Sequence, residues 1–148
     1  MDITYSIKEN SEEEAIKAEN MRRKVYGIES TFDVKDSYYT REISQGNILL
    51  FTCEINEITV AACYISNSFN SLYVEYLFVL PEYQEKSLHL GKNLLQYICD
   101  NKKIVEEYFN CKLNHSLLSP TTEKSRAIYE SMGYKVTNKI LNIMRKNV

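Results

Sequence analysis

The sequence predicts one domain of the mixed α/β (α+β) class, built on a central mixed sheet. The chain has 148 residues, 44% of them apolar, which suits a single compact domain with a buried core. Short β-rich runs alternate along it with segments of helical periodicity. No repeat, low-complexity stretch or linker interrupts this order, so residues 1–148 are expected to form a single domain.

The N-terminal part predicts a strand followed by a helix. The run ITYSI at Ile3 to Ile7 is β-rich and alternating, and Ser11 stands three residues before Glu14 in the pattern of a capping box. A helix is therefore expected to begin near Ser11 and to end near Gly27. Its apolar face would carry Ala15, Ala18, Met21 and Val25, which recur at spacings of three and four residues.

The middle of the chain predicts a loop and then three strands. Residues 28–46 have a mixed pattern, expected to be loop with one further helical turn. The β-rich runs NILLFTCE and ITVAACYIS are separated by only three residues, which favours an antiparallel hairpin. A turn at Asn67 to Ser71 then leads into a third β-rich run, LYVEYLFVLP.

The C-terminal part alternates helices and strands. After the polar loop PEYQEKSLH, one apolar stripe of Leu90, Leu94, Leu95 and Ile98 predicts a helix that continues toward Phe109. A strand within CKLNHSLLS should precede Pro120 and a helix that continues to about Met132 and ends at Gly133. The runs YKVTN and ILNIMRK suit a last pair of strands.

Composition excludes several classes of function. A net charge of −2 and a pI near 5.8 provide no broad positive field, so neither nucleic acid nor a membrane surface is expected as a partner. The N-terminus lacks a secretory signal and no run approaches the roughly 20 apolar residues of a membrane span, which predicts a cytoplasmic protein. The four cysteines, expected to be reduced, form no cluster with histidine of the kind that binds zinc, so no metal is predicted: Cys53, Cys63, Cys99 and Cys111.

The stretch from Leu72 to Leu95 is a candidate anion site. A strand, a polar loop with a glycine and an amphipathic helix follow one another there. Such a turn presents backbone N–H groups and the positive end of a helix, which together can hold a pyrophosphate without a metal ion. Turns of this kind also serve as plain structural connections, so the arrangement alone decides nothing.

Three stretches give the sequence its resemblance to the GNAT superfamily of N-acetyltransferases. EYLFVLPEYQ at Glu75 to Gln84 resembles the fourth strand of the family and the start of its coenzyme loop, and SRAIYESMGYKV at Ser125 to Val136 resembles the helix and strand that follow. MRRKVYGIE is similar to the end of the first helix in some members. The resemblance covers nearly the whole chain. It implies a mostly antiparallel, twisted sheet flanked by helices, with acetyl-CoA as co-substrate and an amine as acceptor.

The resemblance also implies a set of coenzyme-binding residues. The family's fourth strand lends main-chain groups to the pantetheine arm, and the loop and the start of the next helix bind the pyrophosphate. Transferred to this chain, these elements correspond to Leu77, Phe78, Val79, Gln84, Glu85, Lys86, Ser87, Leu88, His89, Leu90, Gly91 and Lys92. Thr122 and Ser125, on the polar face of the later helix, complete the set.

The loop departs from the family pattern, which is Gln or Arg, two residues, Gly, one residue, then Gly or Ala. Gln84 fits the first position, but Ser87 and His89 stand where the two glycines belong. An insertion of two residues restores the match, because Gly91 then takes the place of the glycine that opens the helix. This register keeps Leu94 and Leu95 on the buried face of that helix.

Tyr129 and Glu75 are the candidate catalytic residues. Tyr129 shares one helix face with Thr122 and Ser125, beside an apolar edge of Ile128 and Met132 that is expected to face the core. By resemblance Tyr129 is the general acid that protonates the departing thiolate. The alternative is a tyrosine packed by its ring, with its hydroxyl bonded to a carbonyl.

Glu75 lies in an otherwise apolar strand, where a buried carboxylate is costly unless it faces a cavity or solvent. It is the candidate base, acting directly or through water, and the alternative is a partly exposed glutamate in a salt bridge. His89 and His115 are weaker candidates for the same role.

The sequence therefore predicts an acetyl-CoA-dependent N-acetyltransferase that works by direct attack of a primary amine. Two alternatives stay open: a non-catalytic acyl-CoA-binding module of the same fold, and an acyltransferase with another acyl donor or an oxygen acceptor. The acceptor itself is not identified, and a homodimer is left open.

Overall fold

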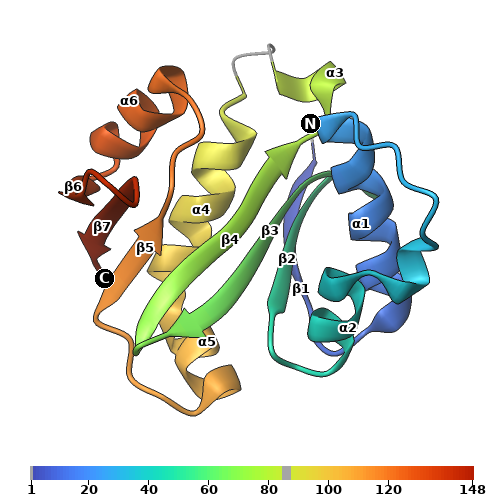
Figure 1. Cartoon of the computed structure of the whole chain (residues 1–148), viewed down its shortest axis with the longest axis horizontal. Coiled ribbons are helices and arrows are strands. Elements are labelled where there is room, and N and C mark those ends of the chain that lie inside the picture. Colours follow the sequence, from blue (N-terminus) through green and yellow to red (C-terminus); the bar gives the residue numbers. More distant parts are fainter. Residues whose placement is uncertain (1, 85–87) are drawn as a thin grey trace.

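The computed structural model describes residues 2–84 and 88–148, which form one seven-stranded sheet with helices on both faces (Figure 1). The strands are β1 (Ile3–Lys8), β2 (Leu49–Ile55), β3 (Ile58–Ser68), β4 (Ser71–Val79), β5 (His115–Leu118), β6 (Lys135–Asn138) and β7 (Ile143–Asn147). The helices are α1 (Glu12–Tyr26), α2 (Tyr38–Ser44), α3 (Pro81–Gln84), α4 (Leu90–Asp100), α5 (Lys102–Phe109) and α6 (Glu123–Ser131), with a short 3-10 turn η1 (Val34–Asp36).

The sheet has the order β1-β2-β3-β4-β5-β7-β6. Every neighbouring pair is antiparallel except β4 and β5, which are parallel. The prediction of a mixed, mostly antiparallel sheet flanked by helices is confirmed. Within the described residues no helix is long and apolar enough to cross a membrane.

Helix α1 begins and ends where its capping residues predict. The Ser11 side chain accepts a hydrogen bond from the Glu14 amide, and three acidic residues occupy the first turn, where the helix dipole favours negative charge. Gly27 ends the helix in a left-handed conformation (φ 63°), and its N–H donates to carbonyls of the last turn. The predicted strands and the remaining helices are found close to their expected places.

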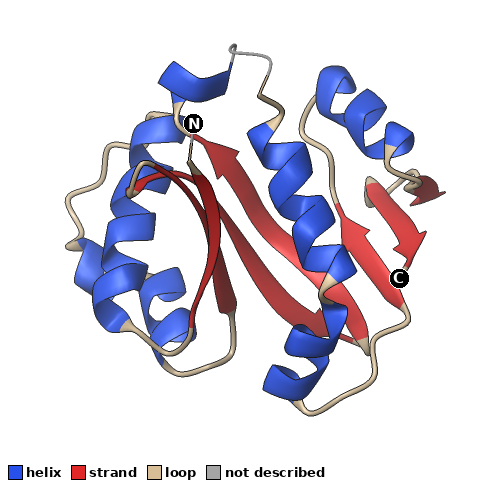
Figure 2. Ribbon diagram, turned by 180° about the vertical axis from the view of Figure 1, so that it is seen from behind, coloured by secondary structure: helices blue, strands red, loops and turns tan. Residues whose placement is uncertain are grey.

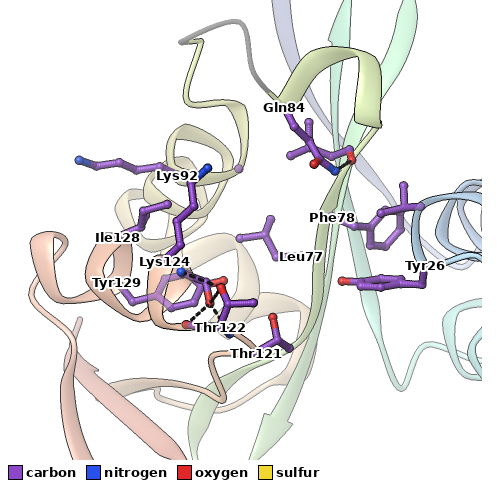
Figure 3. A pocket seen from close by; sticks show the side chains of 14 residues that line it. Tyr26, Leu77, Phe78, Gln84, Lys92, Thr121, Thr122, Lys124, Ile128 and Tyr129 are labelled. Carbon is purple, nitrogen blue, oxygen red and sulfur yellow. Dashed lines mark hydrogen bonds between the residues drawn. The ribbon is translucent and has the colours of Figure 1, made fainter.

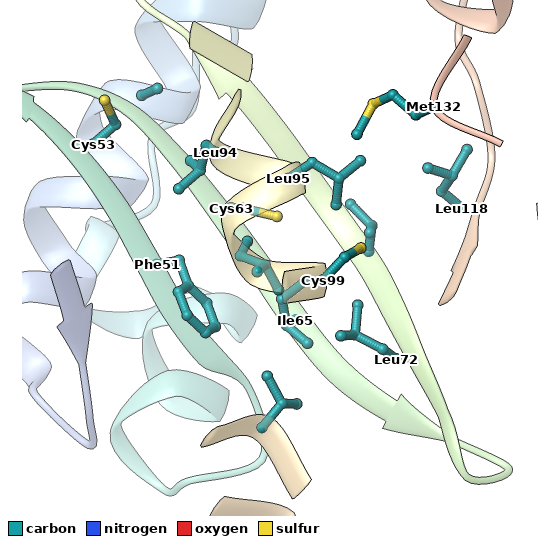
Figure 4. Close-up of a cluster of buried hydrophobic side chains, with 14 of the residues drawn as sticks. Phe51, Cys53, Cys63, Ile65, Leu72, Leu94, Leu95, Cys99, Leu118 and Met132 are labelled. Atoms are coloured by element: carbon teal, nitrogen blue, oxygen red, sulfur yellow. The ribbon is translucent and has the colours of Figure 1, made fainter. Parts of the chain in front are cut away.

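Side chains on the two faces of the sheet form two cores, because neighbouring residues of a strand point to opposite sides. Phe51, Cys63 and Ile65 lie on the face covered by α4, where they meet Leu94 and Leu95 (Figure 4). The opposite face is covered by α1 and α2 (Figure 2). There Leu50, Ala62, Tyr64 and Phe78 pack against Ala15 and Ala18 of α1 and Ile43 of α2.

One buried polar cluster fastens α1 to the sheet. The fully buried carboxylate of Glu19 accepts hydrogen bonds from Arg22 at 2.6 Å, from the Ser37 hydroxyl at 2.8 Å and from the Tyr64 hydroxyl at 2.8 Å. Burial alone would raise the pKa of Glu19, but these donors bring it below its usual range. The carboxylate is therefore charged and fully partnered.

Two local expectations need correction. Residues 28–46 hold more than one helical turn, because Asp33 and Ser37 cap η1 and α2 with their side chains. The helix that was expected to run on toward Phe109 is interrupted at Asn101, whose N–H donates to carbonyls of the last turn of α4, and α5 then begins anew.

Strands β4 and β5 pair over a short length only, and this opens the sheet. Ser71 to Tyr73 pair with His115 to Leu117, whereas β4 continues alone on that side to Val79. A register shift in the β3–β4 ladder leaves Glu75 without a partner in β3, because Tyr64 pairs with Tyr76 and the next residue pairs with Val74. Glu75 is thus the extra residue of a β-bulge.

Candidate active site

A cleft lies where β4 and β5 have parted, between β4 and α6 (Figure 3). It has a volume of about 330 Å³. The end of α1, strand β4, the first turn of α4 and helix α6 supply most of its walls. Its lining residues are Val25, Tyr26, Leu77, Phe78, Val79, Gln84, Gly91, Lys92, Thr121, Thr122, Lys124, Ser125, Ile128 and Tyr129.

The cleft extends at both ends into further hollows that share its walls. An outer hollow of about 760 Å³ shares Val79, Gln84 and Gly91 and reaches His89 at the start of α4. An inner hollow of about 110 Å³ shares Tyr26, Leu77 and Tyr129 and reaches Glu75. The three hollows therefore adjoin one another, and this row of hollows, called the passage below, leads from the N-terminus of α4, past Tyr129, to Glu75.

The edge of β4 faces this passage with its backbone. The Leu80 N–H donates to the Val60 carbonyl of β3, so by alternation the N–H and carbonyl groups of Leu77 and Val79 point away from β3 toward the cleft. The Gln84 side chain donates to the Val79 carbonyl at 2.8 Å. The Phe78 side chain lies on the opposite face of the strand, in the core beneath α1.

The first turn of α4, at the outer end of the cleft, has amides without a partner inside the helix. The first amide to bond within the helix is that of Asn93, which donates to the His89 carbonyl, so the N–H groups of Leu90, Gly91 and Lys92 have no partner in the helix. A side chain on Gly91 would lie 3.4 Å from Val79 and 3.9 Å from Leu77. These are ordinary van der Waals distances, so a methyl group would fit at this position, whereas a branched side chain would press on β4.

His89 has a left-handed backbone (φ 49°), a conformation that favours glycine. Its place before the helix corresponds to the first family glycine when two residues are inserted, and Gly91 then corresponds to the second. The predicted loop residues Glu85, Lys86 and Ser87 lie outside the described residues. Leu88 packs against the core, and its carbonyl accepts from the Asn93 side chain.

Two lysines stand at the outer part of the cleft. Lys92 comes from the first turn of α4 and Lys124 from the first turn of α6, and both line the cleft and its outer hollow. Neither has an ion-pair partner in the part of the chain that the structure describes. The predicted residues Thr122 and Ser125 line the same wall, where their hydroxyls and amides form a reciprocal capping box for α6.

Tyr129 projects from α6 into the middle of the cleft. Its ring packs edge-on against Tyr134 at 5.9 Å, and its hydroxyl has no hydrogen-bond partner among the described residues. The alternative of a hydroxyl bonded to a carbonyl is therefore not found. Burial raises the pKa of Tyr129 to about 12, so the phenol stays protonated at neutral pH.

Ile128, which was expected to face the core with Met132, does not do so. Met132 is buried, but Ile128 is 37% exposed and lines the cleft. Ile128 lies on the side of α6 that borders the cleft, together with Tyr129 (Figure 3).

Glu75 lies at the inner end of the passage. Its carboxylate accepts a hydrogen bond from the Ser66 hydroxyl at 2.8 Å, and it shares the inner hollow with Tyr26 and Tyr129. No cation pairs with it within residues 2–84 and 88–148, so the predicted alternative of a salt bridge is not found. Of the two histidines, His89 reaches the outer hollow, whereas His115 lies in β5 beside Ser71, at the other end of β4.

Some lining residues were not predicted from the sequence, above all Tyr26, Thr121 and Lys124. Tyr26 ends α1, and only the loose resemblance of MRRKVYGIE to the family pointed to that region. Lys124 directly precedes Ser125 in the sequence, and a positive charge next to the family motif of α6 could have indicated a residue that faces the phosphates of the coenzyme.

The comparisons with known proteins agree with this geometry. Residues 46–136 match the acetyltransferase (GNAT) domain family, which is more than half of the chain. The chain belongs to the GNAT acetyltransferase family. A search of curated protein sequences found no match.

Solved structures of the same fold extend over nearly the whole GNAT chain. The PaiA N-acetyltransferase of Thermoplasma acidophilum, in complex with coenzyme A, is 19% identical, with a TM-score of 0.67 over 98% of this chain and 99% of that one. The ribosomal-protein-S18-alanine N-acetyltransferase of Escherichia coli is 15% identical, with a TM-score of 0.68 over 98% and 94%. A GNAT-family acetyltransferase of Staphylococcus aureus is 13% identical, with a TM-score of 0.70 over 99% of both chains.

Proposed function

We propose that this GNAT chain is an acetyl-CoA-dependent N-acetyltransferase that transfers the acetyl group to a primary amine by direct attack. The observation that carries the proposal is the order of groups along the cleft. Helix amides that have no hydrogen-bond partner within residues 2–84 and 88–148 come first, then the open edge of β4, then the Tyr129 hydroxyl, and last the Glu75 carboxylate. A pyrophosphate, a pantetheine arm, a thiol and an amine require these groups in the same order.

The residues of the outer cleft fit coenzyme A. Amides of Leu90, Gly91 and Lys92 suit the pyrophosphate, and the ammonium groups of Lys92 and Lys124 supply positive charge beside it. The backbone N–H and carbonyl of Leu77 and the N–H of Val79 can pair with the amides of the pantetheine arm, as an added strand would, and the Val79 carbonyl can do so where the Gln84 side chain gives way. The bound acetyl-CoA supplies the activated thioester.

Glu75 is the proposed base. An alkylamine has a pKa of about 10.4 and is mostly protonated at neutral pH, so it must lose a proton before its nitrogen can attack. The carboxylate, oriented by Ser66, takes that proton directly or through a water molecule. The amine nitrogen then forms a bond to the acetyl carbon, the carbon–sulfur bond breaks, and the nitrogen loses its second proton.

Tyr129 is the proposed partner of the departing sulfur. Its hydroxyl donates to the thiolate as the charge develops and passes its proton to the sulfur, and the phenolate regains a proton from solvent. The raised pKa makes Tyr129 a weaker acid than free tyrosine, but it also keeps the donor protonated throughout the neutral range. Two protons leave the ammonium group and one arrives at sulfur, so the reaction releases one proton overall.

One observation favours the non-catalytic module as a second candidate. Neither Ser87 nor His89 retains the glycine of the family loop, and His89 takes up the left-handed backbone without being glycine. Both candidates predict coenzyme binding, so only turnover separates them. Turnover measured with acyl-CoA donors of different length, and with acceptors that carry a hydroxyl group, tests the remaining alternatives of another acyl donor or an oxygen acceptor.

The test is release of free thiol from acetyl-CoA in the presence of a panel of primary amines. We expect release that depends on one class of amine, together with an N-acetyl product of the corresponding mass. Tight coenzyme binding without release over the whole panel would instead favour the non-catalytic module.

A further inference from the structure

The inner hollow has one acidic residue and no basic residue in its lining. Its lining residues are Tyr26, Val74, Glu75, Tyr76, Leu77, Leu118, Ser119, Thr121 and Tyr129, and among them only Glu75 has a carboxyl side chain. The volume of about 110 Å³ is below that of roughly 150 Å³ cavities known to hold a benzene ring. The hollow thus has room for a narrow arm and for one ammonium group opposite one carboxylate.

A row of tyrosines leads outward from this hollow over α1, β4 and α2. Tyr26 packs against Tyr76 at 5.8 Å between ring centroids, Tyr76 against Tyr39 at 5.3 Å, and Tyr39 against Tyr38 at 5.1 Å. The two ends of the row are open, since Tyr26 is 45% and Tyr38 56% exposed. Figure 3 shows the Tyr26 hydroxyl pointing across the cleft. Such rings give apolar groups a rigid surface and attract organic cations.

A fixed positive charge lies beside the same row. The Arg22 guanidinium lies 4.7 Å from the centre of the Tyr76 ring and 5.1 Å from that of Tyr39. Its partner Glu19 already accepts from Arg22, Ser37 and Tyr64, and is fully buried. A second ammonium group on an acceptor would therefore meet Arg22 near Tyr76, and Glu19 has no capacity left to offset it.

We propose that the inner hollow and the tyrosine row form an acceptor subsite for a monoamine, in which one primary ammonium group on an unbranched arm carries an aromatic or other apolar body. Glu75 binds the ammonium group, and Tyr26 and Tyr76 hold the body outside the hollow. Polyamines are rejected because their further charges meet no second carboxylate among the described residues that line the hollow and the tyrosine row, and they approach Arg22. The role of this subsite in catalysis rests on the proposed function, but its preference for monoamines can be measured by binding alone, without turnover.

The experiment is calorimetric titration of three amines into the protein saturated with coenzyme A. 2-Phenylethylamine has the unbranched arm, 1-phenylethylamine has the same ring on a branched carbon, and spermidine is the polycation. We expect 2-phenylethylamine to bind at least about tenfold more tightly than either of the others, the equivalent of one lost favourable contact. Equal or tighter binding of spermidine would overturn the proposal.

Substitutions of Tyr26 test whether its ring contributes to the binding preference. Tyr26→Ala should weaken binding of 2-phenylethylamine by about tenfold, whereas Tyr26→Phe, which keeps the ring, should stay within about threefold of the wild type. The control is Phe69→Ala, because Phe69 is fully exposed in the β3–β4 turn, and it should change nothing. Unchanged affinity in Tyr26→Ala would refute the subsite. Selective binding of 2-phenylethylamine without thiol release would support the subsite and count against the proposed transfer.

Discussion

Replacing Tyr129 by phenylalanine removes one hydroxyl and leaves the rest of the cleft in place. The ring keeps its contact with Tyr134, and the hydroxyl has no partner to lose among the described residues. The free energy of unfolding should therefore change by less than about 0.5 kcal/mol, as for a substitution that breaks no contact. If the hydroxyl serves the leaving sulfur, turnover should fall by about ten- to ten-thousandfold, the range for losing a positioned proton donor.

Tyr134→Phe is the matched control. Tyr134 is buried next to Tyr129, and its hydroxyl lies 2.6 Å from that of Ser116. Removing it leaves the Ser116 hydroxyl buried without this partner, which costs about 1–3 kcal/mol. For a chain of this length the cost corresponds to a fall in Tm of roughly 2–12 °C. Turnover at a temperature well below Tm should stay close to the wild-type value.

Turnover and Tm measured on the same preparations separate the two roles of tyrosine. We expect Tyr129→Phe to be stable and slow, and Tyr134→Phe to be unstable and active. A Tyr129→Phe variant with nearly full turnover would show that the Tyr129 hydroxyl does not serve the leaving sulfur. The pKa of Tyr129, raised to about 12, adds a pH test: alkaline conditions up to about pH 10 should not remove its proton, so no loss of turnover in that range should depend on Tyr129.

Three further predictions concern the base, the helix start and the buried carboxylate. Glu75→Gln should lower kcat at neutral pH by at least about tenfold. The Kd for coenzyme A should be unchanged, since the glutamine amide oxygen can still accept the hydrogen bond from Ser66. An unaffected kcat would exclude Glu75 as the base. Gly91→Val should raise the Kd for coenzyme A by at least about tenfold, because its branched methyl groups would press on Val79 and move α4. Gly27→Ala is the control for a general loss of stability, since a Cβ at Gly27 would meet no atom within 4 Å but would be strained by the positive φ, and it should leave the Kd for coenzyme A unchanged. Glu19→Ala should cost about 3–5 kcal/mol in urea unfolding, because it leaves the Arg22 charge partly buried without its partner, and a cost below about 1 kcal/mol would contradict the assigned network.

Most of the elements could be predicted because their signals are local. Ser11 and Gly27 define α1 through capping geometry that involves only the adjacent turns. The spacing of Leu94, Leu95 and Ile98 places the apolar face of α4 toward the sheet. Such patterns depend on neighbours within a few residues, so the sequence contains them directly.

The geometry of the cleft depends on contacts between distant segments. The resemblance to GNAT proteins pointed to β4, the helix start and Tyr129, but not to the exposure of Ile128, which borders the cleft together with Tyr129. Tyr26 and Glu75 are far apart in the chain, and they meet only because α1 crosses the face of β4 where the bulge turns Glu75 out of the ladder. No local sequence pattern predicts that α1 crosses β4 at the bulge. The loop residues 85–87 remain predictions from the resemblance alone.

Titration of acetyl-CoA into the purified chain, followed by measurement of Tm at saturation, tests the coenzyme site directly. We expect one molecule of acetyl-CoA to bind per chain. At a hundredfold excess over Kd, a ligand that binds only the folded state adds about 2.7 kcal/mol, which should raise Tm by roughly 5–11 °C. The gain should be reduced in Gly91→Val and retained in Tyr129→Phe. An unchanged Tm and no heat of binding at saturating acetyl-CoA would contradict the assignment of the cleft between β4 and α6 as a coenzyme site.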